Sequence, residues 1–202
     1  MKRRYAPRVS DDQVIHTERL RQIELRADAI ESLLKGDLVS AGRLQGFEIP
    51  VEFLETINNA FLKVQMERLL LRPSVRGWCV RVIIREKDEK VIGHSGFHGH
   101  LRDVGRAEIG YLIFKNFRGK GYATEAALGL VNWAREQGVE KVFAAVSSKN
   151  HSSIRVAERA GFHPTGGQGI EIDDEEILFE RNTQHGISGF NRERTATHFK
   201  IP

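Results

Sequence analysis

The spacing of apolar residues predicts one strand and two helices in the first part of the chain. Residues 20–25 indicate a short strand. Residues 27–35 carry apolar side chains at helical spacing and stop at Gly36, a residue suited to end a helix. A second helical stretch begins behind Pro50 and must end before Pro73, because proline interrupts helical hydrogen bonds. It is predicted to be one longer helix whose apolar face is formed by Phe53, Ile57, Phe61 and Val64.

The apolar pattern then changes from a helical period to that of strands. Residues 78–85 and 91–98, joined by a charged turn, predict a hairpin, and residues 106–114 predict a strand that continues an antiparallel sheet. Residues 124–137 return to helical spacing after a polar loop that contains glycine. Residues 142–146 form an apolar run typical of a strand covered on both faces. Strand, helix and strand therefore predict a parallel crossover.

The last part of the pattern predicts one more helix and a closing hairpin. Asn150 can cap a helix that ends at Gly161. Residues 170–172 and 177–179 are separated by an acidic run, which is most simply the solvated turn of the hairpin. We expect one domain with two short extensions: a flexible basic arm at 1–16, the domain at 17–182 and a tail at 183–202.

Composition and charge narrow the classes of function. The chain has 202 residues, of which 40% are hydrophobic and 29% charged, as in an ordinary single globular domain. Its formal net charge is +4, which the basic residues among the first ten account for: Lys2, Arg3, Arg4 and Arg8. The rest of the chain is about neutral, which argues against a nucleic-acid-binding surface. The arm is most simply a solvated chain end.

Cysteine content and apolar run length indicate the compartment. Cys79 is the only cysteine, so neither an internal disulfide nor a cysteine-based zinc site can form. No apolar run approaches the length that spans a bilayer, and no apolar segment follows the basic start as in a signal peptide. The sequence therefore predicts a cytoplasmic protein without a membrane partner.

The most informative stretch is the loop at 118–124, between a predicted strand and the start of a helix. Its two glycines allow the backbone to approach a ligand closely, and the free N–H groups of a helix start attract phosphate. The Walker pattern fails, because Phe114 stands at its first glycine and Gly121 replaces its Ser or Thr. A dinucleotide fingerprint lacks its third glycine, and Glu140 precedes the next strand instead of ending it.

The residues around this loop resemble the GNAT superfamily, the GCN5-related N-acetyltransferases. Arg118-x-x-Gly121-x-Ala123 is similar to the pyrophosphate loop Arg/Gln-x-x-Gly-x-Gly/Ala of that family. Segments 108–111, 123–126 and 150–162 are similar to a bacterial branch that includes ribosomal-protein N-terminal acetyltransferases. The resemblance implies an α/β acyl-CoA N-acyltransferase fold, with a mixed, mostly antiparallel sheet splayed around acetyl-CoA. It also implies acetyl transfer to a primary amine, by a monomer or homodimer and without a metal.

The resemblance assigns acetyl-CoA to particular residues. The pyrophosphate would lie on the backbone N–H groups of Arg118, Gly119, Lys120, Gly121, Tyr122, Ala123 and Thr124. The strand backbone at Tyr111, Leu112 and Ile113 would pair with the pantetheine amides and direct an N–H at the thioester oxygen. A donor in that place lowers the barrier of acyl transfer by about 3 kcal/mol. Asn150 would reach the pantetheine or the reacting sulfur, although its position equally fits a plain helix cap.

Direct transfer to an amine needs a base for the incoming ammonium and an acid for the leaving thiolate. Glu108, on the strand before the loop, is the candidate base by resemblance, and it could equally be a solvated or paired strand charge. Many relatives carry an acidic tyrosine seven residues after the Asn, where this chain has Ala157. Ser153 or a water is the candidate substitute, and Ser153 also fits a residue that bonds local backbone.

Two further groups of reactive residues are given other roles. Cys79 lies in a strand rich in Val and Ile, so it is predicted to be a buried structural thiol and not an acyl carrier. His94, His98 and His100 have the spacing of one strand face. This spacing favours a metal site less than a role of His98 as substrate contact or auxiliary base.

Two other function classes stay open at this point. A non-catalytic acyl-CoA-binding or regulatory module on the same fold is favoured by Ala157, and acetyl-CoA turnover would separate it from the enzyme. A nucleotide-binding oxidoreductase would prefer NAD to coenzyme A. The acceptor follows no pattern in the sequence: a protein N-terminus, a polyamine, an antibiotic amine and an amino acid all fit.

Overall fold

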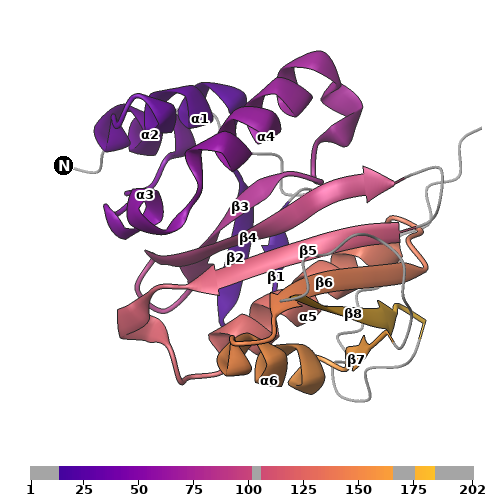
Figure 1. Cartoon of the computed structure of the whole chain (residues 1–202). Helices are drawn as coiled ribbons and strands as arrows, with labels where there is room; N and C mark the ends of the chain where they lie inside the picture. The colour runs from indigo at the N-terminus through magenta and orange to yellow at the C-terminus, as the bar shows by residue number, and fades with distance from the viewer. Residues whose placement is uncertain (1–13, 102–105, 166–175, 185–202) are drawn as a thin grey trace, which may run out of the picture.

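The described part of the chain folds around one eight-stranded, mostly antiparallel sheet, in the order β1-β2-β3-β4-β5-β6-β8-β7 (Figure 1). The computed structural model describes residues 14–101, 106–165 and 176–184. The strands are β1 (Ile15–His16), β2 (Leu20–Glu24), β3 (Val80–Arg85), β4 (Lys90–Leu101), β5 (Arg106–Ile113), β6 (Lys141–Ser147), β7 (His163–Pro164) and β8 (Glu176–Asn182). The neighbours β5 and β6 run parallel, which confirms the predicted crossover and the mixed α/β class.

Helices cover both faces of the sheet (Figure 1). They are α1 (Ala27–Leu34), α2 (Leu38–Gln45), α3 (Glu52–Thr56), α4 (Asn59–Leu71), α5 (Tyr122–Glu136) and α6 (His151–Arg159), with short 3₁₀ turns η2 (Pro73–Val75) and η4 (Lys115–Phe117). The helices α1 to α4 pack on β2, β3 and β4 through one apolar cluster, and α5 and α6 pack on the opposite face through another. The central strand β3 is therefore buried at every position. None of the helices described is long and apolar enough to cross a membrane.

The single longer helix predicted between the two prolines is wrong. The chain forms α3 and α4 there, separated at Ile57, whose backbone is extended. Asn58 starts α4, because its Oδ1 accepts hydrogen bonds from the backbone N–H groups of Ala60 and Phe61, at 2.7 and 3.3 Å. The break shifts the buried face of α4 to Leu62 and Gln65, and Val64 is 51% exposed. A local cap thus overrides the apparent period, and α2 was not predicted at all.

The strand β6 is covered less than its apolar sequence predicts. Its residues alternate between buried and partly exposed, because the helices α1 to α4 lie over β2 to β4 and do not reach it. The strand β8 pairs with β6 and β7, whereas the predicted hairpin strand 170–172 lies outside the described residues. So do residues 1–13 of the arm and 185–202 of the tail. The short strand β1 pairs with β2 and begins before Thr17, the expected start of the domain.

Candidate active site

The parallel strands β5 and β6 separate after only three residue pairs. Arg106, Ala107 and Glu108 pair with β6, and beyond Glu108 the two strands diverge (Figure 1). The strand β5 stays paired with β4 along its length, and β6 stays paired with β8. The edges of β5 and β6 that face each other therefore carry N–H and C=O groups without a strand partner. This divergence is the splay that the sequence led us to expect.

A cavity of about 700 Å³ lies at this divergence. Its walls come from α3 and α4, β3, β4, β5, β6 and the start of α6. Four predicted site residues line it together: Tyr111, Leu112, Asn150 and Ser153. His94 and His98 line it as well, whereas Ile113 is buried in an apolar cluster. The chain thus brings residues far apart in sequence to one cavity.

The glycine loop ends at the start of α5 in the geometry expected of an anion site. Gly119 and Gly121 have φ of 76° and 80°, a region in which other residues are strained. The N–H groups of the first turn of α5 have no partners within the helix. Arg118 donates from Nε to the carbonyl of Ile113 at 2.8 Å, so its side chain fixes the loop to the end of β5. The ring of Tyr122 is buried, which leaves only its backbone for a ligand.

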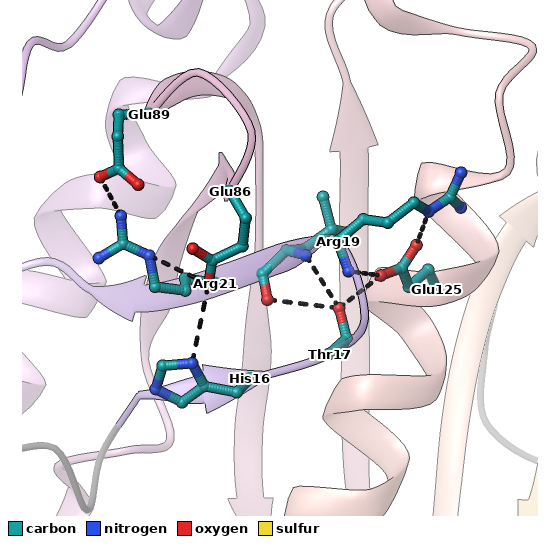
Figure 2. A network of polar contacts seen from close by, with 8 residues as sticks. His16, Thr17, Arg19, Arg21, Glu86, Glu89 and Glu125 are labelled. Carbon is teal, nitrogen blue, oxygen red and sulfur yellow. Dashed lines mark hydrogen bonds and ion pairs between the residues drawn. The ribbon is translucent and has the colours of Figure 1, made fainter. Parts of the chain in front are cut away.

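A polar network fixes the start of α5 to the turn between β1 and β2 (Figure 2). Glu125 Oε1 accepts hydrogen bonds from Thr17 Oγ1 at 2.6 Å and from the backbone N–H of Arg19 at 2.7 Å. Glu125 Oε2 accepts from Arg19 Nε at 2.7 Å, and Arg19 Nη1 donates to the carbonyl of Lys120 at 3.0 Å. The arginine compensates a carboxylate that would repel an anion at this helix start. The contact between Arg19 and Glu125 was not predicted from the sequence, because 106 residues separate them.

The side chains of Glu108 and His98 contact each other at the point where the strands separate. Glu108 Oε1 lies 3.3 Å from His98 Nδ1, and the two side chains are 41% and 47% exposed. The ring of Phe61 on α4 packs against the His98 ring, with 5.1 Å between centroids. A Cβ at Gly110 would lie 2.3 Å from His98 Nε2, so the imidazole needs a glycine there. Glu108 is therefore a paired charge, and His98 is the member of the pair that lines the cavity.

The other histidines of β4 do not assemble a metal site in the described part of the chain. His94 lies deeper, edge-on to Phe53 with 5.6 Å between ring centroids. The register between β4 and β5 shifts between Phe97 and Gly99, which marks a β-bulge at His98. The side chain of His100 is outside the described residues. No group of three or more His, Cys, Asp or Glu side chains that could hold a metal occurs among those described.

The start of α6 contains a helix cap, and Ala157 within α6 occupies the position at which many relatives carry a tyrosine. Asn150 Oδ1 accepts a hydrogen bond from the backbone N–H of Ser153 at 3.1 Å, so the helix-cap interpretation of Asn150 is confirmed. The cap uses the oxygen of the amide and leaves its NH₂ for a ligand. Tyr111 donates its hydroxyl to the carbonyl of Ser153 at 3.4 Å, and burial raises the pKa of Tyr111 to about 12. Ala157 is 1% exposed and packs in the apolar core, so this position supplies no acid for the leaving thiolate.

Cys79 is fully buried on the chain segment before β3. Burial, and next the nearby charge of Glu24, raise the pKa of its thiol to about 12. The thiol therefore stays protonated near neutral pH, and a protonated thiol is a poor nucleophile. This geometry agrees with the structural role predicted for it.

His94 makes the stability of the fold sensitive to acid. Burial lowers its pKa from 6.5 to about 4, against the opposing effect of a hydrogen bond to the Thr56 backbone. The folded chain thus favours neutral His94, so this contribution is complete above pH 6.5 and is lost as the pH falls towards 4. We expect His94→Gln to reduce the loss of unfolding free energy between pH 7 and pH 4 by about 3 kcal/mol. Urea unfolding at both pH values measures it.

The same substitution at the exposed His151 is the control for this prediction. An acid-induced loss of stability in His94→Gln equal to that of the wild-type chain would show that His94 is not the group responsible.

Comparison with known proteins agrees with this geometry. The profile of the acetyltransferase (GNAT) domain family matches residues 20–163. The chain is similar to two proteins of Bacillus subtilis, both described as uncharacterized N-acetyltransferases. It is 27% identical to YjdG over 74% of this chain and 89% of that protein, and 32% identical to YoaA over 76% and 84%. A ribosomal-protein-S5-alanine acetyltransferase from Vibrio fischeri shares the fold, with a TM-score of 0.57, 17% identity, and coverage of 85% of this chain and 97% of that one.

The family profile covers most of the chain, and the identity to YoaA extends over most of both proteins. The sheet order, the flanking helices and the diverging strands match the fold that the loop and its flanking segments imply. The chain therefore belongs to the GNAT acetyltransferase family and is an acetyl-CoA-dependent N-acetyltransferase.

Proposed function

We propose that acetyl-CoA lies across the divergence of β5 and β6, with its pyrophosphate on the loop 118–124. The observation that carries the proposal is the unpaired edge of β5 beyond Glu108, which leads directly to a helix start preceded by two glycines. The pantetheine amides would hydrogen-bond to Tyr111, Leu112 and Ile113 as a further strand does. The thioester then lies in the cavity, beside His98 and Ser153.

The reaction we infer is direct attack of a primary amine on the thioester. The pair of Glu108 and His98 takes a proton from the ammonium, with His98 Nε2 facing the amine and Glu108 holding the proton on Nδ1. The free amine attacks the carbonyl carbon, so that a C–N bond forms and the C–S bond breaks. A backbone N–H of β5 stabilises the oxyanion during the attack.

The leaving thiolate of coenzyme A takes up a proton from Ser153 or from a water. Ser153 lines the cavity at the start of α6, beside the amide of Asn150. The acid is the smaller contribution, because a thiolate leaves more readily than an alkoxide or an amine anion. The position of the relatives' tyrosine is occupied by the buried Ala157, which cannot donate a proton. The reaction does not depend on that position, because Ser153 or a water supplies the proton.

The acceptor enters between α4 and β4, where Phe61, Val64 and His98 line the cavity. Its amine belongs to a protein N-terminus or to a small molecule. The Vibrio fischeri neighbour is, by its name, an acetyltransferase of an alanine of ribosomal protein S5, which supports a protein acceptor for this fold.

Turnover with a panel of amines tests the proposed function. Acetyl-CoA is incubated with peptides that have free N-termini, a polyamine, an aminoglycoside and amino acids, and thiol release and acetylated products are measured. We expect acetylated product and thiol in equal amounts with at least one class. A chain that binds acetyl-CoA but acetylates none of them would be a non-catalytic binding module.

A further inference from the structure

Gln65 is a buried amide without a partner in the described part of the chain. It lies on α4, is 0% exposed, and neither its Nε2 nor its Oε1 makes a hydrogen bond there. Burial of a polar group without a hydrogen bond destabilises a fold, so such groups are rare unless something binds them. Gln65 is one of the residues that line the active-site cavity.

His94 lines the same cavity and carries a second unsatisfied atom. Its Nε2 is buried and makes no hydrogen bond to the described residues. Its other ring nitrogen, Nδ1, is therefore the one that bonds to the Thr56 carbonyl. In a neutral imidazole a protonated Nδ1 leaves Nε2 as a pure acceptor. His94 thus needs a donor from whatever occupies the cavity.

Gln65 lies on the helix face that contacts the proposed catalytic pair. One turn before it, Phe61 packs on the ring of His98, and one turn after it Arg68 Nη1 donates to the His98 carbonyl at 3.0 Å. The described lining of the cavity includes no Asp, Glu, Lys or Arg. This part of the cavity can therefore satisfy a neutral polar group but not a second charge.

We propose that Gln65 and His94 form a subsite for a neutral group of the acceptor that both donates and accepts hydrogen bonds, a hydroxyl or an amide. Such a group donates to Gln65 Oε1 or His94 Nε2 and accepts from Gln65 Nε2. A carboxylate could accept only from Gln65 Nε2 and would face the acceptor atoms Gln65 Oε1 and His94 Nε2 with no cation in the lining, and a second ammonium would leave the Gln65 NH₂ unpaired. The inference rests on the proposed function, because it names the acceptor class of the same cavity.

Matched amines test the subsite. We expect kcat/KM for ethanolamine to exceed that for propylamine, and β-alaninamide to exceed β-alanine, by about 10- to 100-fold. Peptides that begin with Thr and Val form the same comparison for a protein acceptor. Their ratio shows whether a peptide or a small amine is the source of the group. Equal rates within all three pairs would overturn the proposal.

Variants of α4 show whether Gln65 carries the preference. Gln65→Met, which keeps the length of the side chain without its amide, should bring the ratio of ethanolamine to propylamine close to one. Glu67→Met, two positions later on α4, exposed and outside the cavity lining, is the control and should keep the wild-type ratio. A ratio that survives Gln65→Met contradicts the assignment.

Thermal unfolding and calorimetry test the subsite without a turnover assay. Gln65→Met should raise the midpoint of thermal unfolding of the free protein, since it removes an unpaired buried amide. A lower midpoint would show that the amide has a partner inside the protein, and the proposal would fail. If no amine is acetylated at all, the proposed function fails. Calorimetry of ethanolamine against propylamine, with coenzyme A present, still tests the subsite.

Discussion

Glu108→Gln is expected to lower kcat by about 10²- to 10⁴-fold while affinity for acetyl-CoA stays the same. Glutamine keeps the shape of the side chain and can still accept a hydrogen bond from His98 Nδ1, which lies 3.3 Å from the carboxylate. It lacks the negative charge that stabilises the imidazolium formed when His98 takes the amine proton. The dependence of kcat/KM on pH should therefore change in Glu108→Gln, and it should follow the ionisation of the acceptor alone in His98→Gln, which lacks the base. Steady-state rates across pH measure both effects.

Two further variants separate this mechanism from a structural charge. His98→Gln should be as slow as Glu108→Gln, and the double variant no slower than either, because the two residues act as one unit. Glu89→Gln, at an exposed carboxylate that is paired with Arg21 and is not part of the cavity lining, is the control (Figure 2). Unchanged rate and pH profile in Glu108→Gln would leave catalysis to positioning and the oxyanion donor alone.

Gly121→Val is expected to weaken coenzyme A binding by about 10- to 100-fold. The valine must adopt a φ of 80°, and its side chain would stand at the helix start, where the backbone approaches the pyrophosphate. Arg19 Nη2 lies 3.4 Å from the added Cβ, so the network that fixes the loop would also shift. Calorimetric titration with coenzyme A measures the loss.

Gly138→Val provides the matched control at the other end of α5. Its φ is 81°, and nothing lies within 4 Å of an added Cβ, so the backbone strain is alike and the loop is untouched. Both variants should lower the unfolding temperature, and only Gly121→Val should lose affinity. Equal coenzyme A affinities in the two variants would remove the loop from the binding site.

The parts of the site that were predicted from the sequence are local in the chain. The loop 118–124, the strand before it and the cap at Asn150 each depend on a few adjacent residues, and each occurs where it was expected. The resemblance added the order in which these segments meet. The divergence of β5 from β6 follows from that order and was predicted with it.

The missed features depend on contacts between distant segments or on one local cap. Arg19 finds Glu125 only after the sheet and α5 are assembled, and no spacing in the sequence relates them. The helix break at Ile57 is set by the side chain of Asn58, which caps α4. The spacing of the apolar residues continues across the break, so it does not reveal the cap. Gln65 was missed for the same reason, since the assumed helix placed a different face towards the sheet.

The short pairing of β5 with β6, which is three residue pairs long, also links the folding equilibrium of the chain to the binding of acetyl-CoA. In the proposed complex, the cosubstrate completes an edge of the sheet that the chain itself leaves open. Acetyl-CoA binds the folded chain and not the unfolded one, so mass action links the two equilibria. A concentration 100 times the Kd adds about 2.7 kcal/mol to the free energy of unfolding. The concentration of acetyl-CoA then contributes to the stability of the enzyme as well as to its rate.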